Sequence, residues 1–240
     1  MYTRKFFIPA LGASSKDISR YGDLIRPLGV RSFPSYHAAP EVCYPYGVFG
    51  WKPVGFQELA GYLVKHFNFN EDTCPKEPTG TFIERQHRKV TNMVELVSVT
   101  KKLGLRTQVV SLEKLTVLEQ YATIRCTDVL VGVQGAGLQW AMFMRRKRAL
   151  IELCFPGWGP LFSNDLRNCN GLVTKTVSGM KDGAQWGFVE KYLKKNKPFT
   201  EEEKRQFGSA KFMDSKYRPA DFEKTLREVL QTLKLKPLPV

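Results

Sequence analysis

Residues 128–140, with the sequence DVLVGVQGAGLQW, restrict the fold of this chain more than any other segment. The apolar residues up to Val133 are typical of a buried strand, the glycine-rich turn Gln134–Gly137 follows, and helix-compatible residues begin at Leu138. A strand that enters a helix through such a turn presents backbone N–H groups and the positive end of the helix dipole, which suits a phosphate. The same small residues would also let a helix and a strand pack closely, and the turn alone leaves both interpretations open.

Strands and helices alternate around this turn at the spacing of βαβ units. We expect strands at 81–83, 107–112, 128–133, 149–153 and 172–177, and helices at 91–103, 115–126 and 138–144. Thr91 is the expected N-cap of the first of these helices, which Gly104 would end. The alternation predicts an α/β fold with a doubly wound parallel sheet. Ligands bind at the carboxyl edge of such sheets, where the turn Gln134–Gly137 is expected to lie.

The chain is strongly basic, with 37 Lys and Arg residues against 23 Asp and Glu residues and a formal net charge of +14. Basic residues gather at Arg145–Arg148 and Lys191–Lys197. No recognisable RNA- or DNA-binding motif accompanies them, so we expect solvated basic faces and no nucleic-acid partner. No apolar run approaches the roughly 20 residues that span a bilayer, and Met1–Lys5 does not resemble the start of a signal peptide. We therefore expect a soluble chain, and its abrupt strand-like start suggests a fragment.

The 5 cysteines show neither a CxxC pair nor the spacing of a zinc site. Cys126 and Cys154 lie in apolar segments, so we expect both to be small core residues. Cys43, Cys74 and Cys169 lie in loop-like sequence and are expected to be available for a disulfide if the protein is secretory.

Residues 219–233 have the pattern of an amphipathic helix, with an apolar stripe that includes Phe222, Leu226 and Val229. An isolated helix of this length is marginally stable in water. We therefore expect it to pack back on the rest of the chain.

Three segments together resemble the motifs of glycosyltransferase family 61. They are RQHRKVTN followed by EL at 85–96, DVLVGVQGAGL at 128–138, and IEL at 151–153. The resemblance is close over residues 80–155 and looser in the flanks. The family includes the EGF-domain-specific O-GlcNAc transferase, the protein O-mannose GlcNAc transferase and plant pentosyltransferases. Two departures are that Gln134 stands where the family has a histidine, and that Arg85 and Arg88 are one residue closer together than usual.

The resemblance implies a GT-B-like architecture, in which two Rossmann-like domains hold a nucleotide sugar between them. Residues 1–78 would then be part of an amino-terminal, acceptor-side domain with its connector. Residues 79–190 would be the nucleotide-sugar-binding domain, and residues 191–240 a basic segment with the terminal helix. The implied activity is inverting transfer of N-acetylglucosamine or a pentose from a UDP-sugar to a hydroxyl of a protein or glycan. The implied location is the lumen of the ER or Golgi, with membrane attachment only through an anchor absent from this sequence.

Loss of UDP creates negative charge, which an enzyme must stabilise as it develops. GT-B enzymes commonly use no metal, and the sequence has no Asp-x-Asp pair, so we expect neither a metal nor a cofactor. Arg88 is the first candidate for a diphosphate clamp and Arg85 the second, although either is also consistent with an ordinary surface arginine. Glu113 either contacts the ribose or uracil or is a simple loop carboxylate. The expected donor-binding turn comprises Gln134, Gly135, Ala136, Gly137 and Leu138.

Asn92 and Glu95 are expected to cap and orient the first helix, and Glu152 to act as a partnered structural brace inside a strand. The general base for the acceptor hydroxyl stays unknown, with His37 and His87 as candidates. Two other functions stay open. One is a non-catalytic descendant of the family, which Gln134 favours because a glutamine side chain can neither carry charge nor transfer a proton. The other is a Rossmann methyltransferase, which the late position of the glycine turn disfavours.

Overall fold

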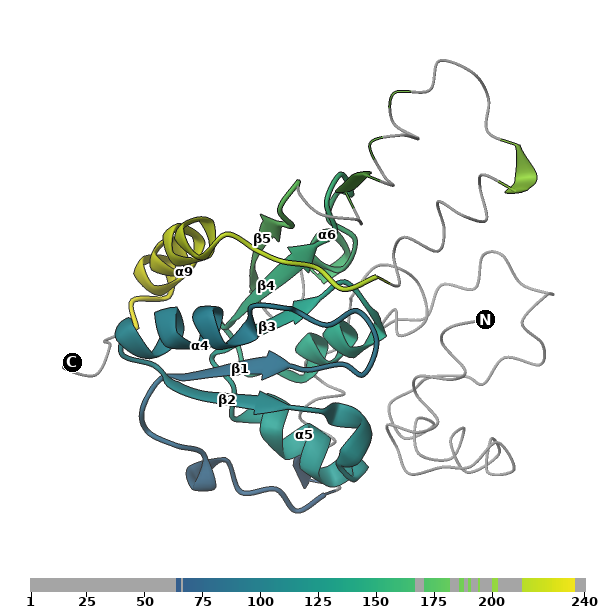
Figure 1. Cartoon of the computed structure of the whole chain (residues 1–240). Coiled ribbons are helices and arrows are strands. Elements are labelled where there is room, and N and C mark those ends of the chain that lie inside the picture. The colour runs from purple at the N-terminus through teal and green to yellow at the C-terminus, as the bar shows by residue number, and fades with distance from the viewer. Residues whose placement is uncertain are drawn as a thin grey trace, which may run out of the picture.

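The computed structural model describes residues 67–166, 171–181 and 213–235, together with 64–65, 186–187, 190, 194 and 200–202. A parallel five-stranded sheet in the order β2-β1-β3-β4-β5 forms its centre (Figure 1). The strands are β1 (Thr79–Ile83), β2 (Arg106–Val110), β3 (Val129–Val133), β4 (Ala149–Cys154) and β5 (Val173–Ser178). The predicted α/β class and parallel sheet are therefore confirmed. The predictions for residues 1–63, which include His37, lie outside the described residues.

Two long helices cover one face of the sheet. They are α4 (Met93–Lys102) and α9 (Pro219–Leu233), which lie side by side on the same side of the sheet (Figure 1). Alternate residues of β3, Val129, Val131 and Val133, point to this face and form one core cluster with both helices. This clustering follows from the two-residue period of a strand. The amphipathic helix predicted at 219–233 is confirmed, and it packs on α4 and β5.

The opposite face is covered by α5 (Val117–Arg125), the 3₁₀ helix η5 (Ala136–Phe143) and the short helix α6 (Phe162–Leu166). Tyr121 of α5 is completely buried there, between Phe67, Phe69 and Phe143. Burial raises the pKa of the Tyr121 hydroxyl to about 12. Two further 3₁₀ turns, η3 (Glu71–Thr73) and η4 (Leu112–Lys114), lie before β1 and after β2.

The segment after the glycine turn differs from the α-helix expected at 138–144. It is a 3₁₀ helix, in which the Leu138 amide donates to the Gly135 carbonyl at 2.9 Å. Trp140, Met142 and Phe143 are all buried, and the polar Gln139 is half-buried. Tertiary packing therefore decides its conformation, and residue propensity for the α-helix does not.

The start of α4 also differs from the prediction. Its N-cap is Asn92 and not Thr91, and the Asn92 side chain makes no capping bond. Instead, Asn92 Nδ2 donates to the Tyr217 carbonyl at 2.7 Å, and the Tyr217 amide donates to Asn92 Oδ1 at 3.1 Å. Glu95 accepts a longer bond from Asn92, at 3.3 Å. Asn92 thus joins α4 to the segment that leads into α9.

The expectation that Cys126 is a core residue is wrong, because it forms a disulfide with Cys74. Cys126 is the C-cap of α5, and Cys74 lies in the connector that enters β1. Both cysteines therefore precede neighbouring parallel strands, and the strand order brings them together. Cys154 is buried and free, as expected, and burial raises the pKa of its thiol to about 12. In the described part of the chain, no helix combines the length and the apolar character needed to cross a membrane.

Candidate functional site

The loops after β1 and β3 meet at the carboxyl edge of the sheet. The two strands are hydrogen-bonded neighbours, but α4 leaves β1 toward one face and η5 leaves β3 toward the other. In open α/β sheets such a divergence forms the crevice in which ligands bind, and for this strand order it lies between β1 and β3. The arginine-containing loop and the glycine turn both border this point, as their positions after the two strands predict.

Arg85 lies directly against the glycine turn. A Cβ atom placed on Gly135 would be 1.6 Å from Arg85 Nη1 and 2.9 Å from its Cζ. Gly135 has an extended backbone with φ 166°, so it is the close approach of Arg85, and not the backbone angle, that requires a glycine here. Arg85 Nη1 is buried and has no hydrogen-bond acceptor among the described residues. A buried guanidinium nitrogen without an acceptor fits a site for an anion.

Arg88 is held more firmly by the protein. Its Nη1 donates to the Gln134 carbonyl at 3.1 Å, and its Cζ lies 5.9 Å from the centroid of the Phe155 ring. Its backbone is left-handed, with φ 64°, which is uncommon for a residue other than glycine. Arg88 therefore bridges the loops after β1, β3 and β4.

The Gln134 side chain is turned into the protein. It is 5% exposed, its Nε2 donates to the Gly159 carbonyl at 2.7 Å, and its Oε1 accepts from the Phe155 amide at 3.4 Å. The side chain that was expected to contact the donor thus binds the loop after β4. Sequence reasoning missed Phe155 and Gly159, although their position directly after a buried strand signals the same edge of the sheet.

The other residues of the turn have distinct surroundings. Ala136 and Gly137 are the first residues of η5, and their amides precede its first internal hydrogen bond. Leu138 is 1% exposed, and its Cδ2 would lie 2.8 Å from a Cβ on Gly132, so it serves close packing. His87 and Glu113 are exposed, His87 between the two arginines and Glu113 in η4 beyond β2. The structure thus brings Arg85, Arg88 and the turn together.

Two carboxylates near these motifs have structural contacts. Glu152 is completely buried in β4 and accepts hydrogen bonds from the amides of Leu161, Phe162 and Ser163 and from the Ser163 hydroxyl. This is the expected brace, and it holds the start of α6. Asp128 lies at the opposite, amino edge of the sheet, where its Oδ2 accepts from the Thr79 amide at 2.8 Å.

Asp128 also binds the basic segment Arg145–Arg148. Its Oδ1 is 2.6 Å from Arg148 Nε and 3.2 Å from Arg145 Nη2. Arg146 and Lys147 are the exposed residues of this segment, whereas Arg145 and Arg148 are half-buried, so the expectation of a solvated basic face is correct for half of it. Among the described residues, no group of three or more His, Cys, Asp or Glu side chains is placed to hold a metal ion.

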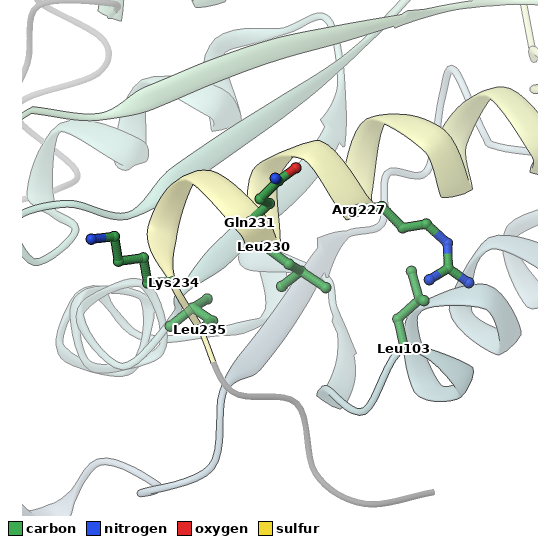
Figure 2. A pocket seen from close by; sticks show the side chains of 6 residues that line it. All are labelled: Leu103, Arg227, Leu230, Gln231, Lys234 and Leu235. Atoms are coloured by element: carbon green, nitrogen blue, oxygen red, sulfur yellow. The ribbon is translucent and has the colours of Figure 1, made fainter.

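Two hollows lie away from this edge. One, of about 360 Å³, is lined by Leu103, by the carboxy-terminal part of α9 and by the residues just after it, as Figure 2 shows for Arg227, Leu230 and Leu235. The other, of about 630 Å³, is lined by residues that include Asp128, Arg145 and Arg148. Leu103 ends α4 shortly before β2 and Asp128 precedes β3, so both hollows lie at the amino edge. The strand topology favours the carboxyl edge as the functional one.

Taken together, the fold and the arrangement at its edge place this chain in the class of doubly wound α/β proteins. Residues 15–151, more than half of the 240 residues, match the family model described as Glycosyltransferase 61. The chain belongs to this glycosyltransferase family. A search of curated proteins finds no match.

Proposed function

We propose that this chain binds a UDP-sugar in the crevice between β1 and β3. We further propose that it transfers the sugar, N-acetylglucosamine or a pentose, to a hydroxyl of a protein or glycan. The observation that carries the proposal is the Arg85 guanidinium, which lies against Gly135 with a buried Nη1 that lacks an acceptor in the described part of the chain. The activity would resemble that of the O-GlcNAc-transferring members of the family, and the second domain of a GT-B enzyme would complete the cleft.

In the proposed reaction, the acceptor oxygen forms a bond to the anomeric carbon while the bond from that carbon to the diphosphate breaks. The electron pair leaves with UDP, the configuration inverts, and the acceptor proton passes to a general base. Arg85, Arg88 and the amides of Ala136 and Gly137 would stabilise the charge that develops on the diphosphate. His87, on the arginine loop, and His37 stay the candidates for the base. Neither a metal nor a cofactor is part of this proposal.

We also propose that the protein acts in the lumen of the ER or Golgi. The Cys74–Cys126 disulfide supports this location, because disulfides form and persist mainly in oxidising compartments. The proposed partners are the UDP-sugar and a protein or glycan acceptor, and membrane attachment would come only from a further anchor segment.

Arg85→Ala is expected to weaken UDP binding by about 1.5–3 kcal/mol, because a charge-assisted hydrogen bond is lost. Isothermal titration of the whole chain with UDP measures this loss, and Arg88→Ala is expected to fall in the same range. Lys89→Ala is the matched control, since it removes an exposed positive charge from the same loop. If Lys89→Ala weakened UDP binding as much as Arg85→Ala, the loss would reflect the overall positive charge of the loop and not a specific contact of Arg85. If the Arg85→Ala variant bound UDP as tightly as wild type, Arg85 would not belong to the UDP site.

Gly135→Ala is expected to abolish the close approach of Arg85 while preserving the fold. The added Cβ would displace only the end of a flexible side chain. We therefore expect a change in stability within about 1 kcal/mol but a loss of UDP affinity comparable to that of Arg85→Ala, roughly 1.5–3 kcal/mol. Gly137→Ala is the matched control, because its Cβ would make ordinary contacts of 3.7–3.8 Å with Ile83 and Leu112. Thermal unfolding and titration with UDP measure the two quantities, and equal UDP affinity of the two variants would contradict the prediction.

The alternative is a non-catalytic member of the family that binds the nucleotide without turnover. Gln134 favours it, because a glutamine occupies the place of the family histidine and its amide is bound to the loop after β4. UDP-sugar turnover in the longest natural form of the protein separates the two functions, with UDP release as the readout. Binding of UDP without transfer or hydrolysis would support the alternative. Binding of S-adenosylmethionine but not UDP would overturn both.

A further inference from the structure

Gln134 connects the three loops that surround the proposed donor site. Its carbonyl accepts from Arg88 of the loop after β1, and its side chain binds the loop after β4 at two backbone positions. Its own amide donates to the Leu153 carbonyl at 3.1 Å. With 5% exposure, its side-chain donor and acceptor are both used inside the protein.

The segment Phe155–Leu161, with the sequence FPGWGPL, is held at both ends by such contacts. Gln134 binds the Phe155 amide at the start of the segment and the Gly159 carbonyl farther along, and Glu152 binds the Leu161 amide at its end. Trp158 packs against Phe155 with 6.4 Å between ring centroids. The segment follows β4, the strand beside β3, so it borders the crevice on the side away from β2.

We infer that Gln134 is a positioning residue, which holds the segment Phe155–Leu161 as a wall of the site without itself contacting the donor. The inference rests on the proposed function and deepens it. Glu113 follows β2 on one side of Arg85, and the Phe155–Leu161 segment follows β4 on the other. With the diphosphate at Gly135 and the nucleoside toward Glu113, the wall contacts the sugar that is transferred. Gln134 therefore affects sugar turnover through this wall and leaves UDP affinity largely unchanged.

The chemistry of the two contacts determines which substitutions preserve the wall. Gln134→His retains one N–H donor and one acceptor in the neutral imidazole. Gln134→Glu keeps the size but places an acceptor against the Gly159 carbonyl, and Gln134→Met keeps the shape without any hydrogen bond. Gln139→Met is the matched control, since Gln139 lies five residues further along, in η5.

Hydrogen exchange of residues 155–161 in the ligand-free protein tests the contact itself. Gln134→Met and Gln134→Glu are expected to accelerate exchange there by about tenfold or more, whereas Gln134→His and Gln139→Met stay near wild type. Exchange that is unchanged in both the Met and Glu variants would overturn the inference, whether or not the protein binds UDP.

Kinetics and titration then test the position of the wall. For the Met and Glu variants, kcat/KM for the UDP-sugar is expected to fall by about tenfold or more, with the Kd for UDP within about threefold of wild type and activity rescued in the His variant. A parallel loss of UDP affinity would assign Gln134 to the diphosphate and overturn the inference. If the wild-type protein binds no UDP, the proposed function is contradicted, and so is the inference that the segment Phe155–Leu161 contacts a sugar. The hydrogen-exchange result would still show whether Gln134 holds this segment.

Discussion

Asp128→Ala is expected to destabilise the folded domain by about 3–5 kcal/mol, because it removes one partner of a buried charged cluster. The Asp128 side chain is 6% exposed and binds Arg145, Arg148 and the Thr79 amide. Burial lowers the pKa of the Arg148 guanidinium, and Asp128 opposes this effect. Without the carboxylate, two partly buried arginines at one turn repel each other, and the opposing charge that both of them contact is lost. Urea unfolding at neutral pH, followed by circular dichroism, measures the loss.

Two further variants separate charge from packing. Asp128→Asn keeps an oxygen for the Thr79 amide but removes the charge, so its destabilisation is expected to lie below that of alanine, at about 1–3 kcal/mol. Arg146→Ala removes an exposed charge from the same basic segment, and its effect should stay within about 0.5 kcal/mol. An alanine variant at position 128 as stable as wild type would show that the arginines are adequately solvated.

The Asp128→Asn variant also tests whether Asp128 contributes to stability alone or to UDP binding as well. Asp128 belongs to the motif that contains the glycine turn, but β3 places the two at opposite edges of the sheet. At a temperature where the Asp128→Asn variant is fully folded, its affinity for UDP should equal that of wild type. A loss of affinity comparable to that of Arg85→Ala would show that the motif acts as one unit.

Removal of the Cys74–Cys126 disulfide is expected to lower stability by about 4 kcal/mol at 25 °C. The bond closes a loop with a sequence separation of 52 residues, and its loss releases the entropy that this closure removes from the unfolded chain. Loss of the disulfide also removes the covalent link between the connector before β1 and the end of α5. The ion pair of Arg125 with Glu71, at 2.5 Å, would remain between these segments. The double variant Cys74→Ala/Cys126→Ala, compared with wild type by urea unfolding, measures this loss.

A reducing agent provides the control for the other cysteines. Reductant should lower the stability of wild type toward that of the double variant and leave the variant itself unchanged. Peptide mapping under non-reducing conditions should recover Cys74 linked to Cys126, with Cys154 as a free thiol. A different pairing, or a variant as stable as wild type, would contradict the prediction.

Local sequence patterns predicted most of the fold. The apolar runs at β3 and β4 and the amphipathic stripe of α9 depend on side-chain periodicity, which one segment carries within itself. The place of the glycine turn at the carboxyl edge followed from the βαβ order, and the family from motifs in the same region. The 3₁₀ conformation of η5 did not follow, because Trp140 and its neighbours are surrounded by core residues that the local sequence does not identify.

The details of the candidate site were less predictable. Arg88 was ranked above Arg85 from sequence, yet Arg85 is the residue that lies against Gly135, and Arg88 is bound to Gln134 and Phe155. Gln134 was expected to face the donor, and it binds the loop after β4. Cys126 has apolar neighbours along the chain, and only the adjacency of β1 and β3 brings it to Cys74.

By itself, the sequence determined the α/β class, the elements of the sheet and the membership of a glycosyltransferase family, since these depend on periodicity and on motif order along the chain. Only the tertiary structure decided which side chains of the turn are free for a ligand and which hold the loops together. That distinction depends on contacts between segments after different strands, such as Gln134 with Gly159 and Arg85 with Gly135. Parallel strands bring these segments to one edge, but the direction of each side chain is set by packing that the local sequence does not encode.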